Sequence, residues 1–571
     1  MDGSVGRLLE IEGIGKKKLE IIKLGWEEQK GVKNVMLFLQ SHGISTGYSL
    51  KIYKTYGDSA PEKIRDNPYR LINDVWGIGF KVADNIARNM GFTESDPVRI
   101  KAGIIHLLSE ASRNGHIFIP ESDLVRECSY ILQYELAYSD PLLEELENNG
   151  EIIIVNNDVY LSDFYHAERE IENSINHLLT SPPDLKNDYS KAVRHLKENY
   201  SSEQLEAIKS SITHKFLLIT GGPGTGKTTT LKGIIQLHQI FDKRVLLAAP
   251  TGRAAKRMTE VIGLEAKTIH RLLEYNPHEN SFNYNSEIKL EADLLIIDEV
   301  SMIDTILMYH LITAINKNTT VILVGDVDQL PSVGAGNILK DLISSNKIPV
   351  VQLVTIFRQA KNSDIVLNAH RINKGELPAF NYIKNSDFIF LEESDNKKIP
   401  DKILHLCKDE LPEKFGFDSV NDIQILSPIY KGDVGVTLLN KLMQQQLNPS
   451  TTLYLQGERK YKASDKVMQL RNNYNKNVFN GDIGSVIGVD EEKKIMYISF
   501  EGKLIEYAFE DLDEITLAYA VTVHKSQGSE FPCVIMPLST AHYMMLQRNL
   551  LYTAITRATK LLIIIGTKKA M

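Results

Sequence analysis

The pattern of hydrophobic and polar positions changes along this chain of 571 residues. From about residue 191 onward, continuous apolar runs are each followed by a turn that carries glycine or an acid, and then by a helical segment. Strands that are apolar on both faces belong to a parallel sheet covered by helices. Two such domains are predicted, the first from runs at 216–220, 244–249, 294–297 and 321–324, and the second from runs at 423–426, 515–523, 533–536 and 561–565.

A different pattern interrupts the second of these domains between residues 451 and 513. Segments there alternate apolar and polar positions, which is the period of a strand buried on one face. The alternating segments are 482–489, 495–500 and 504–509. They predict a small antiparallel barrel, inserted between the first two strands of the second α/β domain.

The preceding part of the chain is predicted to be mainly helical. Residues 1–95 form short helices broken by glycine turns, and residues 101–162 form two or three helices followed by β-rich runs at 151–155 and 159–161 around a three-residue turn. This second part is typical of a small winged-helix-like unit. The polar, proline-containing stretch 181–188 is expected to be the main boundary of the chain. The expected domains are 1–95, 96–185, 191–354, 355–450 together with 514–571, and the insertion 451–513.

Composition excludes several classes of protein. No apolar run approaches the roughly 20 residues that cross a bilayer, and residues 1–18 show no export signal, so a cytoplasmic protein is expected. The three cysteines lie more than a hundred residues apart and form no CxxC pair, which argues against a zinc or iron–sulfur site. The net charge of −8 does not exclude a nucleic-acid partner, because the position of the basic residues matters more than their number.

The strongest chemical signal is the segment GGPGTGKT at residues 221–228. It matches GxxxxGK[ST] and lies between a predicted strand and a predicted helix, where such a loop binds phosphate. Its glycines let backbone N–H groups approach the phosphates, Lys227 adds a positive charge for the β- and γ-phosphates, and the Thr228 hydroxyl suits Mg²⁺. The predicted nucleotide contacts are Gly222, Pro223, Gly224, Thr225, Gly226, Lys227, Thr228 and Thr229.

Two adjacent acids follow the apolar run at 294–297. Asp298 is expected to hold Mg²⁺ through water, and Glu299 to orient and deprotonate the attacking water. The second α/β domain has no phosphate loop, so one nucleotide site per chain is expected. Arg358 and Arg557 are candidates for cations that reach across an interdomain cleft to the γ-phosphate, where an arginine stabilises transition-state charge.

Together these segments resemble the superfamily 1 helicases of the RecD type, and within superfamily 1B the RecD2 group most closely. The longest matching segments are GDVDQLPSVGAG at 325–336 and VHKSQGSE at 523–530. The resemblance implies an α/β protein with two RecA-like P-loop NTPase domains, an SH3-like β-barrel insertion and an α-helical N-terminal region of helix-hairpin-helix and winged-helix-like units. Other segments that carry it are Gln204, APTGRAA at 249–255, KTIH at 267–270, FR at 357–358 and YTAITR at 552–557.

The resemblance also implies roles for residues outside the phosphate loop. Gln204 would contact adenine, Glu530 would contact the nucleotide, and Gln329 would couple the γ-phosphate to the DNA groove. The residues expected to contact DNA are Thr251, Arg253, Thr268, His270, Lys431, Thr522, His524 and Lys525.

Three further kinds of DNA contact are implied, each with a structural alternative. Residues 274–291 would form a hairpin pin that splits the duplex, whereas its aromatic residues Tyr275, Phe282 and Tyr284 could equally serve to pack a small hairpin. The insertion 451–513 would touch the strand, or be a purely structural barrel. The glycine turns at 13–15, beside Lys16 to Lys18, and at 77–79, beside Lys81, would bind phosphate through backbone N–H groups, or simply connect helices.

The implied activity is that of an ATP-dependent DNA helicase that uses ATP and Mg²⁺. It would move five-prime to three-prime on single-stranded DNA, act at junctions with duplex DNA, and serve DNA repair or recombination. One alternative is the helicase half of a conjugative relaxase, which is less favoured because no HxH-type metal cluster is evident. Another is a DNA-stimulated ATPase that clamps or remodels nucleic acid without unwinding, which the sequence does not separate from a helicase.

Overall fold

The structure is a computed structural model that describes residues 33, 35–182, 189, 193, 200–277, 279–357, 363–380, 386–456, 459–473 and 475–571. It consists of two compact units, Met1–His166 and Ala167–Met571. We expected the main boundary at 181–188, but the division falls inside helix α9 (Ser162–Thr180). The physical reason is that Ile171, Ile175 and Leu178 of this helix pack into a core of the larger unit.

The predicted glycine turn at 13–15 and its three lysines lie outside the described residues. Within the described part of the chain, no helix combines the length and the apolar character needed to cross a membrane. The cysteines at 128, 407 and 533 are buried and unbridged.

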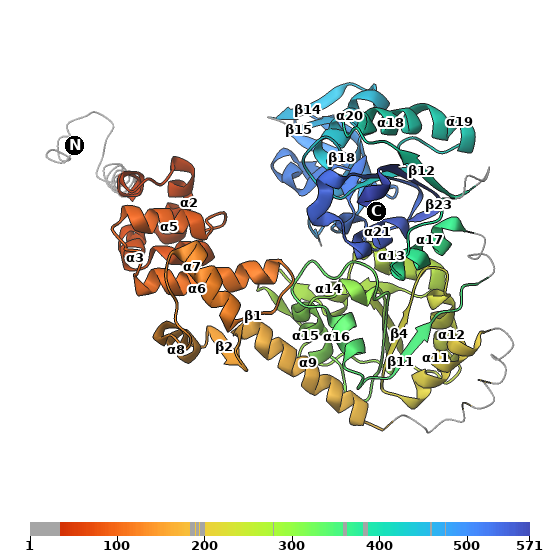
Figure 1. The fold of residues 1–571 in the computed structure, drawn as a ribbon, viewed down its shortest axis with the longest axis horizontal. Coiled ribbons are helices and arrows are strands. Elements are labelled where there is room, and N and C mark those ends of the chain that lie inside the picture. The colour runs from red at the N-terminus through yellow and green to blue at the C-terminus, as the bar shows by residue number, and fades with distance from the viewer. Residues whose placement is uncertain are drawn as a thin grey trace, which may run out of the picture. The chain divides into compact units, whose positions relative to one another are not determined.

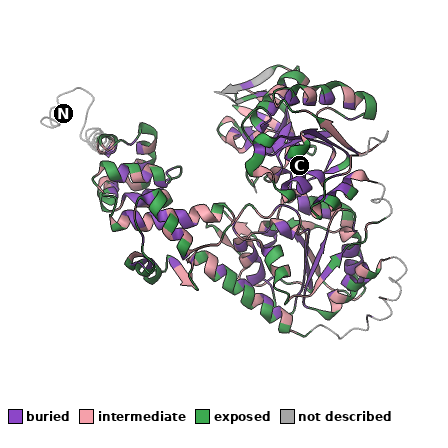
Figure 2. Cartoon of the chain, in the orientation of Figure 1, coloured by how far each residue is buried: buried purple, intermediate pink, exposed green. Residues whose placement is uncertain are grey.

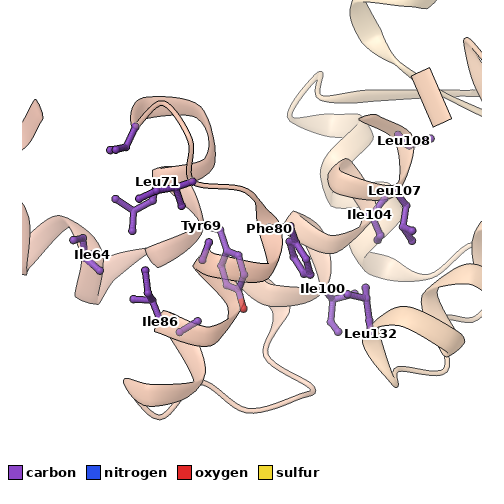
Figure 3. Close-up of a cluster of buried hydrophobic side chains, with 14 of the residues drawn as sticks. Ile64, Tyr69, Leu71, Phe80, Ile86, Ile100, Ile104, Leu107, Leu108 and Leu132 are labelled. Carbon is purple, nitrogen blue, oxygen red and sulfur yellow. The ribbon is translucent and has the colours of Figure 1, made fainter. Parts of the chain in front are cut away.

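Helices form most of the N-terminal unit, and one hydrophobic core holds them together (Figure 3). Tyr69 stacks on Phe80 in this core with ring centroids 5.7 Å apart, and Ile100 and Leu132 lie beside them. The glycine turn at 77–79 directly precedes α5. The helices are α2 (Thr46–Tyr56), α3 (Ala60–Asp66), α4 (Leu71–Asp74), α5 (Phe80–Asn89), α6 (Pro97–Arg113), α7 (Glu121–Leu132) and α8 (Pro141–Asn148).

A buried ion pair joins α5 to α6. Arg99 is 1% exposed, and its Nε donates to Asp84 Oδ1 at 2.8 Å. The Tyr69 hydroxyl donates to the same oxygen at 2.6 Å, and Arg99 Nη1 donates to the carbonyl of Leu132 at 2.9 Å. The buried charges are thus paired and hydrogen-bonded, a condition under which an interior ion pair is tolerated.

A three-stranded antiparallel sheet completes the winged-helix-like part, in the order β1-β3-β2. The strands are β1 (Phe118–Pro120), β2 (Ile152–Val155) and β3 (Asp158–Leu161). Their hairpin turns over two residues, Asn156 and Asn157, and not over the three predicted. Both have positive φ, 53° and 67°, as a tight two-residue hairpin turn requires and as asparagine tolerates.

Six parallel strands form the first sheet of the larger unit, in the order β11-β4-β10-β9-β5-β6. The four predicted runs form its centre, and every residue of β4, β9 and β10 is buried, which explains why these runs are apolar throughout. The short edge strands β6 and β11 were not predicted. The strands are β4 (Phe216–Gly221), β5 (Val245–Ala249), β6 (Ala266–Thr268), β9 (Leu294–Ile297), β10 (Thr320–Gly325) and β11 (Val350–Leu353).

Helices cover both faces of this sheet (Figure 1). Phe216 and Leu218 pack with α15 and α16, whereas Leu217 and Ile219 pack with α11 and α12, because successive side chains of a strand point to opposite faces. Figure 2 shows the result, with buried strands between helices whose outer faces are exposed. The helices are α11 (Ser202–Thr213), α12 (Lys227–Gln239), α13 (Gly252–Ile262), α14 (Ile269–Leu272), α15 (Thr305–Thr313) and α16 (Ile338–Ser344).

A second parallel sheet has five strands in the order β12-β23-β22-β13-β21. It too is covered on both faces, by α17 and α21 on one side and by α18 and α20 on the other. Its edge strand β12 was not predicted. The elements are β12 (Phe388–Glu392), β13 (Ile423–Ser427), β21 (Ala520–Thr522), β22 (Phe531–Leu538), β23 (Ala558–Gly566), α17 (Asp364–Asn373), α18 (Ile399–His405), α19 (Leu411–Phe415), α20 (Val436–Leu447) and α21 (Arg548–Ile555).

The insertion forms a five-stranded antiparallel sheet with its own core, in the order β19-β18-β17-β16-β20. The run 515–523, predicted as one strand of the second α/β domain, is in fact two strands. β20 (Ile515–Leu517) pairs with β16 in the insertion, and β21 pairs with β13. The other strands of this sheet are β16 (Lys466–Gln469), β17 (Ile483–Asp490), β18 (Ile495–Phe500) and β19 (Lys503–Ala508), whereas β14 (Thr452–Gln456) and β15 (Arg459–Lys462) form a separate two-stranded antiparallel sheet.

Candidate nucleotide site and nucleic-acid groove

The phosphate loop links β4 to α12 in a tight turn. Gly224 and Gly226 have φ of 74° and 79°, in the left-handed region that favours glycine. A Cβ at Gly226 would lie only 2.5 Å from Gln204 Nε2, so the close approach of another element also requires glycine there. Lys227 donates from Nζ to two backbone carbonyls at the start of the loop, at 2.5 and 3.2 Å. Its ammonium group therefore lies against the loop predicted to hold phosphate.

A cavity of about 300 Å³ lies over this loop, and residues of both α/β domains line it. Gln204 and Thr225 are buried and are not part of the lining. Arg358 lies outside the described residues. The predicted nucleotide and catalytic residues that line the cavity are Gly222, Pro223, Gly224, Gly226, Lys227, Thr228, Thr229, Asp298, Glu299, Gln329, Glu530 and Arg557.

Four carboxylates line this cavity, Glu530 from the second α/β domain and three from the first. Asp298 and Glu299 follow β9, and Asp326 follows β10. Burial and the neighbouring charge of Glu299 raise the pKa of Asp298 above its usual range. Glu299 has a φ of 54°, an uncommon value for a residue other than glycine and one found at functional sites. Asp326 was not predicted as a site residue, although it follows an apolar run just as Asp298 does.

Arg557 brings positive charge from the second α/β domain to the cavity. It is 3% exposed, and its guanidinium donates to the carbonyls of Thr553 and Ser529 at 3.3 and 3.1 Å and to Thr556 Oγ1 at 3.2 Å. All three acceptors are uncharged. The guanidinium therefore keeps its full charge for an anion in the cavity.

A second arginine at the cavity was not predicted. Arg257 lies on α13, and its Nη2 is 2.7 Å from Oε1 of Glu530. Both residues line the cavity, so this ion pair joins the two α/β domains beside the loop. No signal in the sequence distinguishes Arg257 from other helix-surface arginines.

Gln204 lies behind the phosphate loop, and both ends of its side-chain amide make hydrogen bonds. Its Oε1 accepts from the Ser201 N–H at 3.0 Å in a capping box at the start of α11, and its Nε2 donates to the carbonyl of Gly226 at 3.3 Å. Phe357 reaches the same loop, since its N–H donates to the carbonyl of Gly224 at 3.2 Å and its ring would be 2.9 Å from a Cβ at Gly226. The predicted adenine contact thus lies next to an aromatic ring that was not given a role.

Hydrogen bonds join the two α/β domains next to the cavity. The Tyr552 hydroxyl donates to Asp326 Oδ2 at 2.8 Å, and Gln329 Nε2 donates to the same oxygen at 3.2 Å. The N–H of Leu330 donates to Thr553 Oγ1 at 2.8 Å. The remaining amide oxygen of Gln329 is buried without a hydrogen-bond partner, a costly state that a bound donor would relieve.

Half of the residues expected to contact DNA lie in the first α/β domain. Thr251 caps α13 by accepting from the Ala254 N–H at 3.2 Å, and Thr268 caps α14 in the same way. Arg253 and Thr268 line a second cavity of about 370 Å³, whose opposite wall comes from the insertion and includes Phe479. The insertion therefore borders the surface predicted to carry DNA.

The other expected DNA contacts lie in the second α/β domain. Thr522 ends β21, and His524 and Lys525 follow it. Burial lowers the pKa of His524 and of Lys525 below their usual values. Lys431 is exposed. None of these four residues lines either cavity.

The expected pin is a short hairpin of β7 (Tyr275–Asn276) and β8 (Ser281–Phe282). Its aromatic side chains gather at its foot, where the rings of Tyr275 and Phe282 are 5.0 Å apart and that of His270 is 5.5 Å from Tyr275. Phe282 and Tyr284 also pack against the core of the first α/β domain. These aromatic residues thus have the packing role that we considered as the alternative.

Comparison with known proteins identifies the family. Family models match an AAA domain at residues 204–335, an ATP-dependent RecD2 DNA helicase HHH domain at 28–118, an ATP-dependent RecD-like DNA helicase SH3 domain at 439–500 and a UvrD-like helicase C-terminal domain at 517–565. The ATP-dependent RecD2 DNA helicase of Deinococcus radiodurans is 31% identical to this chain over 97% of its residues and 77% of the relative. The chain belongs to the RecD2 family of ATP-dependent DNA helicases.

Two other proteins that resemble this RecD2-family helicase share less sequence identity with it. The RecBCD enzyme subunit RecD of Buchnera aphidicola is 27% identical over 80% of this chain and 88% of the relative. The solved structure of Bacteroides Pif1 bound to ssDNA is 19% identical, covers 65% of this chain and 93% of that chain, and has a TM-score of 0.39. The family confirms the predicted resemblance, and the described sheets together with the matched HHH and SH3 domains confirm the predicted fold class.

Proposed function

We propose that this RecD2-family helicase moves five-prime to three-prime on single-stranded DNA and unwinds duplex DNA at junctions, in DNA repair or recombination in the cytoplasm. The observation that supports this most is the single cavity lined by a phosphate loop from one α/β domain and an arginine from the other. Such a site closes and opens with the γ-phosphate, which turns hydrolysis into movement of one domain against the other. The direction of movement rests on the resemblance to the RecD2 group.

The residues of the cavity supply the chemistry of hydrolysis. When nucleotide binds, the Lys227 ammonium group leaves its backbone carbonyl acceptors and contacts the β- and γ-phosphates. The Arg557 guanidinium leaves its uncharged acceptors and contacts the negative charge that develops on the γ-phosphoryl group. Groups already aimed at developing charge lower the barrier without reorganisation. Glu299 orients the attacking water and accepts its proton. Gln204 and Glu530 are proposed to hold the nucleotide itself.

The acidic lining fits Mg²⁺. Asp298, Glu299 and Asp326 face one cavity, where burial and the charge of Glu299 raise the pKa of Asp298, and a divalent cation would favour the ionised form of this carboxylate. The Thr228 hydroxyl and the Asp298 carboxylate are hard oxygen donors of the kind that Mg²⁺ prefers. When bound, Mg²⁺ neutralises phosphate charge, and we propose that Thr228 and Asp298 hold it.

The proposed DNA path crosses both α/β domains, so that relative movement of the domains shifts the strand. Gln329 lines the cavity and precedes Leu330, whose N–H is bonded to Thr553 of the second domain, and Gln329 is proposed to couple the γ-phosphate to this path. Contacts to the backbone carry no sequence information, so binding is expected to depend strongly on salt and little on sequence. The proposed contacts are Thr251, Arg253, Thr268, His270, Lys431, Thr522, His524 and Lys525.

The domain bounds that we propose follow the sheets. Residues 1–95 form the helix-hairpin-helix region, and the winged-helix-like unit runs from 96 into α9. The first RecA-like domain spans 191–354, with the pin at 274–291. The second comprises 355–450 and the residues after 517, and the SH3-like insertion spans 451–517, because β20 belongs to its sheet.

A forked-duplex assay tests this function against a DNA-stimulated clamp. One duplex carries a five-prime single-stranded tail and a matched duplex carries a three-prime tail. Release of a strand only from the five-prime-tailed duplex, lost in Lys227→Ala, is the expected result. Release only from the three-prime-tailed duplex would contradict the proposed direction. ATP hydrolysis stimulated by single strands without release from either duplex would favour the clamp.

A further inference from the structure

The hairpin proposed to split the duplex has very little backbone pairing. Its strands pair at two positions, Tyr275 with Phe282 and Asn276 with Ser281. Two-stranded hairpins of this kind are marginally stable in water by themselves. Two backbone hydrogen bonds continue the hairpin at its foot, from the Asn283 N–H to the Glu274 carbonyl at 3.3 Å and from the Tyr284 N–H to the Leu273 carbonyl at 3.2 Å. Because these backbone bonds are few, side-chain contacts at the foot also fix the direction in which the hairpin points.

Those contacts form an aromatic cluster with Phe282 at its centre. The ring centroid of Phe282 lies 5.0 Å from that of Tyr275, 5.7 Å from that of His270 and 4.6 Å from that of His310. Separations and tilts of this kind are favourable between aromatic rings. Burial lowers the pKa of both histidines, so near neutral pH both are uncharged rings. His310 makes the shortest of the three contacts and is the only one of these residues that belongs to α15.

Helix α15 connects this cluster to the nucleotide site. Its N-terminus is capped by Asp304, whose Oδ1 accepts from the Leu307 N–H at 2.8 Å, and the N–H of Thr305 donates to the carbonyl of Ala335 at 2.9 Å. The segment between Glu299 and this cap is only a short 3₁₀ turn, Val300–Met302. Helix α15 therefore runs from the turn that follows Glu299, the proposed general base, to the His310 ring that contacts Phe282.

The tip of the hairpin differs from its foot. Pro277, Glu279 and Asn280 are exposed, and none of them is aromatic. Asn280 is also tied back to the foot, because its Oδ1 accepts from the Tyr275 hydroxyl at 2.6 Å. None of the described residues of the tip therefore offers an aromatic ring on which a base could stack.

We propose that His310 is a positioning residue for strand separation: its ring holds Phe282, and through it the hairpin wedge, in a fixed direction on α15. The inference rests on the proposed role of the hairpin in splitting the duplex. It assigns the histidine a part in unwinding that is separate from binding or hydrolysing ATP, because His310 does not line the nucleotide cavity.

Replacement of His310 separates these two activities. In His310→Ala, unwinding of the five-prime-tailed fork is expected to fall about tenfold or more, whereas ATP hydrolysis stimulated by single-stranded DNA stays within about twofold of wild type. His310→Phe keeps an aromatic ring at this position and is expected to restore unwinding. His405→Ala, which removes an exposed histidine from α18, is the matched control and should change neither activity.

Three results would overturn the inference. They are wild-type unwinding by His310→Ala, a parallel loss of hydrolysis and unwinding, and a failure of His310→Phe to restore unwinding. A variant in which residues 276–281 are replaced by two glycines tests the underlying role of the hairpin. If that variant unwinds normally, the hairpin is not the wedge. If it fails while His310→Ala unwinds normally, the hairpin keeps its role and only the positioning by His310 is wrong.

Discussion

The hydroxyl of Tyr552 donates a 2.8 Å hydrogen bond to Asp326 Oδ2 and so joins the two RecA-like domains beside the nucleotide cavity. Tyr552 is completely buried on α21, and burial together with the nearby carboxylate raises the pKa of its hydroxyl, so the group stays protonated and donates. The same carboxylate oxygen accepts from Gln329. The segment proposed to respond to the γ-phosphate is thus bonded directly to the second domain.

Removal of this hydroxyl should uncouple the domains. We predict that Tyr552→Phe binds nucleotide within a few-fold of wild type, and that its DNA-stimulated turnover falls about tenfold, since a hydrogen bond to a charged group contributes about 1.5–3 kcal/mol. Steady-state hydrolysis at saturating DNA measures this, with the exposed Tyr543→Phe as the control. Unchanged turnover would show that the contact has no part in coupling.

The phosphate loop and the acid pair can be tested with the fold intact. Lys227→Ala removes the charge that lies against the loop, and Glu299→Gln removes the base but keeps the size of a side chain whose backbone has an unusual φ. Each is predicted to abolish DNA-stimulated hydrolysis, because the phosphate contact and the proton acceptor are both required. Thermal unfolding should remain close to that of the wild type. Turnover at the wild-type rate in either variant would refute the assigned site.

Arg557 is predicted to act on the transition state and not on binding. Arg557→Ala should leave nucleotide affinity within a few-fold and lower turnover by about 10³-fold or more. The alanine variant also removes three hydrogen bonds within the second domain, so Arg557→Lys, which keeps the charge, is the companion variant. Titration of a fluorescent nucleotide and single-turnover hydrolysis distinguish the two effects. Weak binding with normal turnover would mean that the role is misassigned.

The sequence was most informative where burial and chemistry coincide. The runs that form β4, β9 and β10 are buried along their whole length, so their continuous apolar character correctly predicted a parallel sheet. The edge strands β6, β11 and β12 are short or partly exposed and gave no such signal. The run 515–523 was wrongly predicted as one strand because it is apolar along most of its length, although only Ile515 of β20 is buried. Hydropathy does not mark the point where a chain leaves one sheet for another.

In the candidate nucleotide site, residues that are adjacent in sequence were likewise predicted, whereas residues that only the fold brings together were not. Loop residues of the phosphate site follow one another in sequence, and their spacing alone predicts a common function. Asp326, Tyr552 and Arg257 reach the cavity or its border from separate elements, so that only the folded chain brings them together. The position of His310 beside Phe282 is likewise a property of packing, since 28 residues of sequence separate two rings that lie 4.6 Å apart.

Acid should destabilise the larger unit through His238. This residue is buried on α12 with its Nε2 3.3 Å from Ser211 Oγ, and burial, aided by the charge of Lys243, lowers its pKa to about 4. An unfolded histidine takes up a proton near pH 6.5, so between pH 6.5 and about 4 the unfolded state binds more protons than the folded state. The contribution of neutral, buried His238 to the free energy of unfolding is therefore complete above this pH window and is lost as the pH falls through it.

The slope of that loss can be measured. We predict that the free energy of unfolding falls by up to about 1.4 kcal/mol per pH unit from this residue within the window. His238→Gln cannot take up a proton, so its urea unfolding at pH 7, 6 and 5 should be less dependent on pH, although its stability at pH 7 is lower. The exposed His405→Gln should keep the wild-type slope. Equal slopes for His238→Gln and wild type would contradict the prediction, because the acid sensitivity would then reside in other groups.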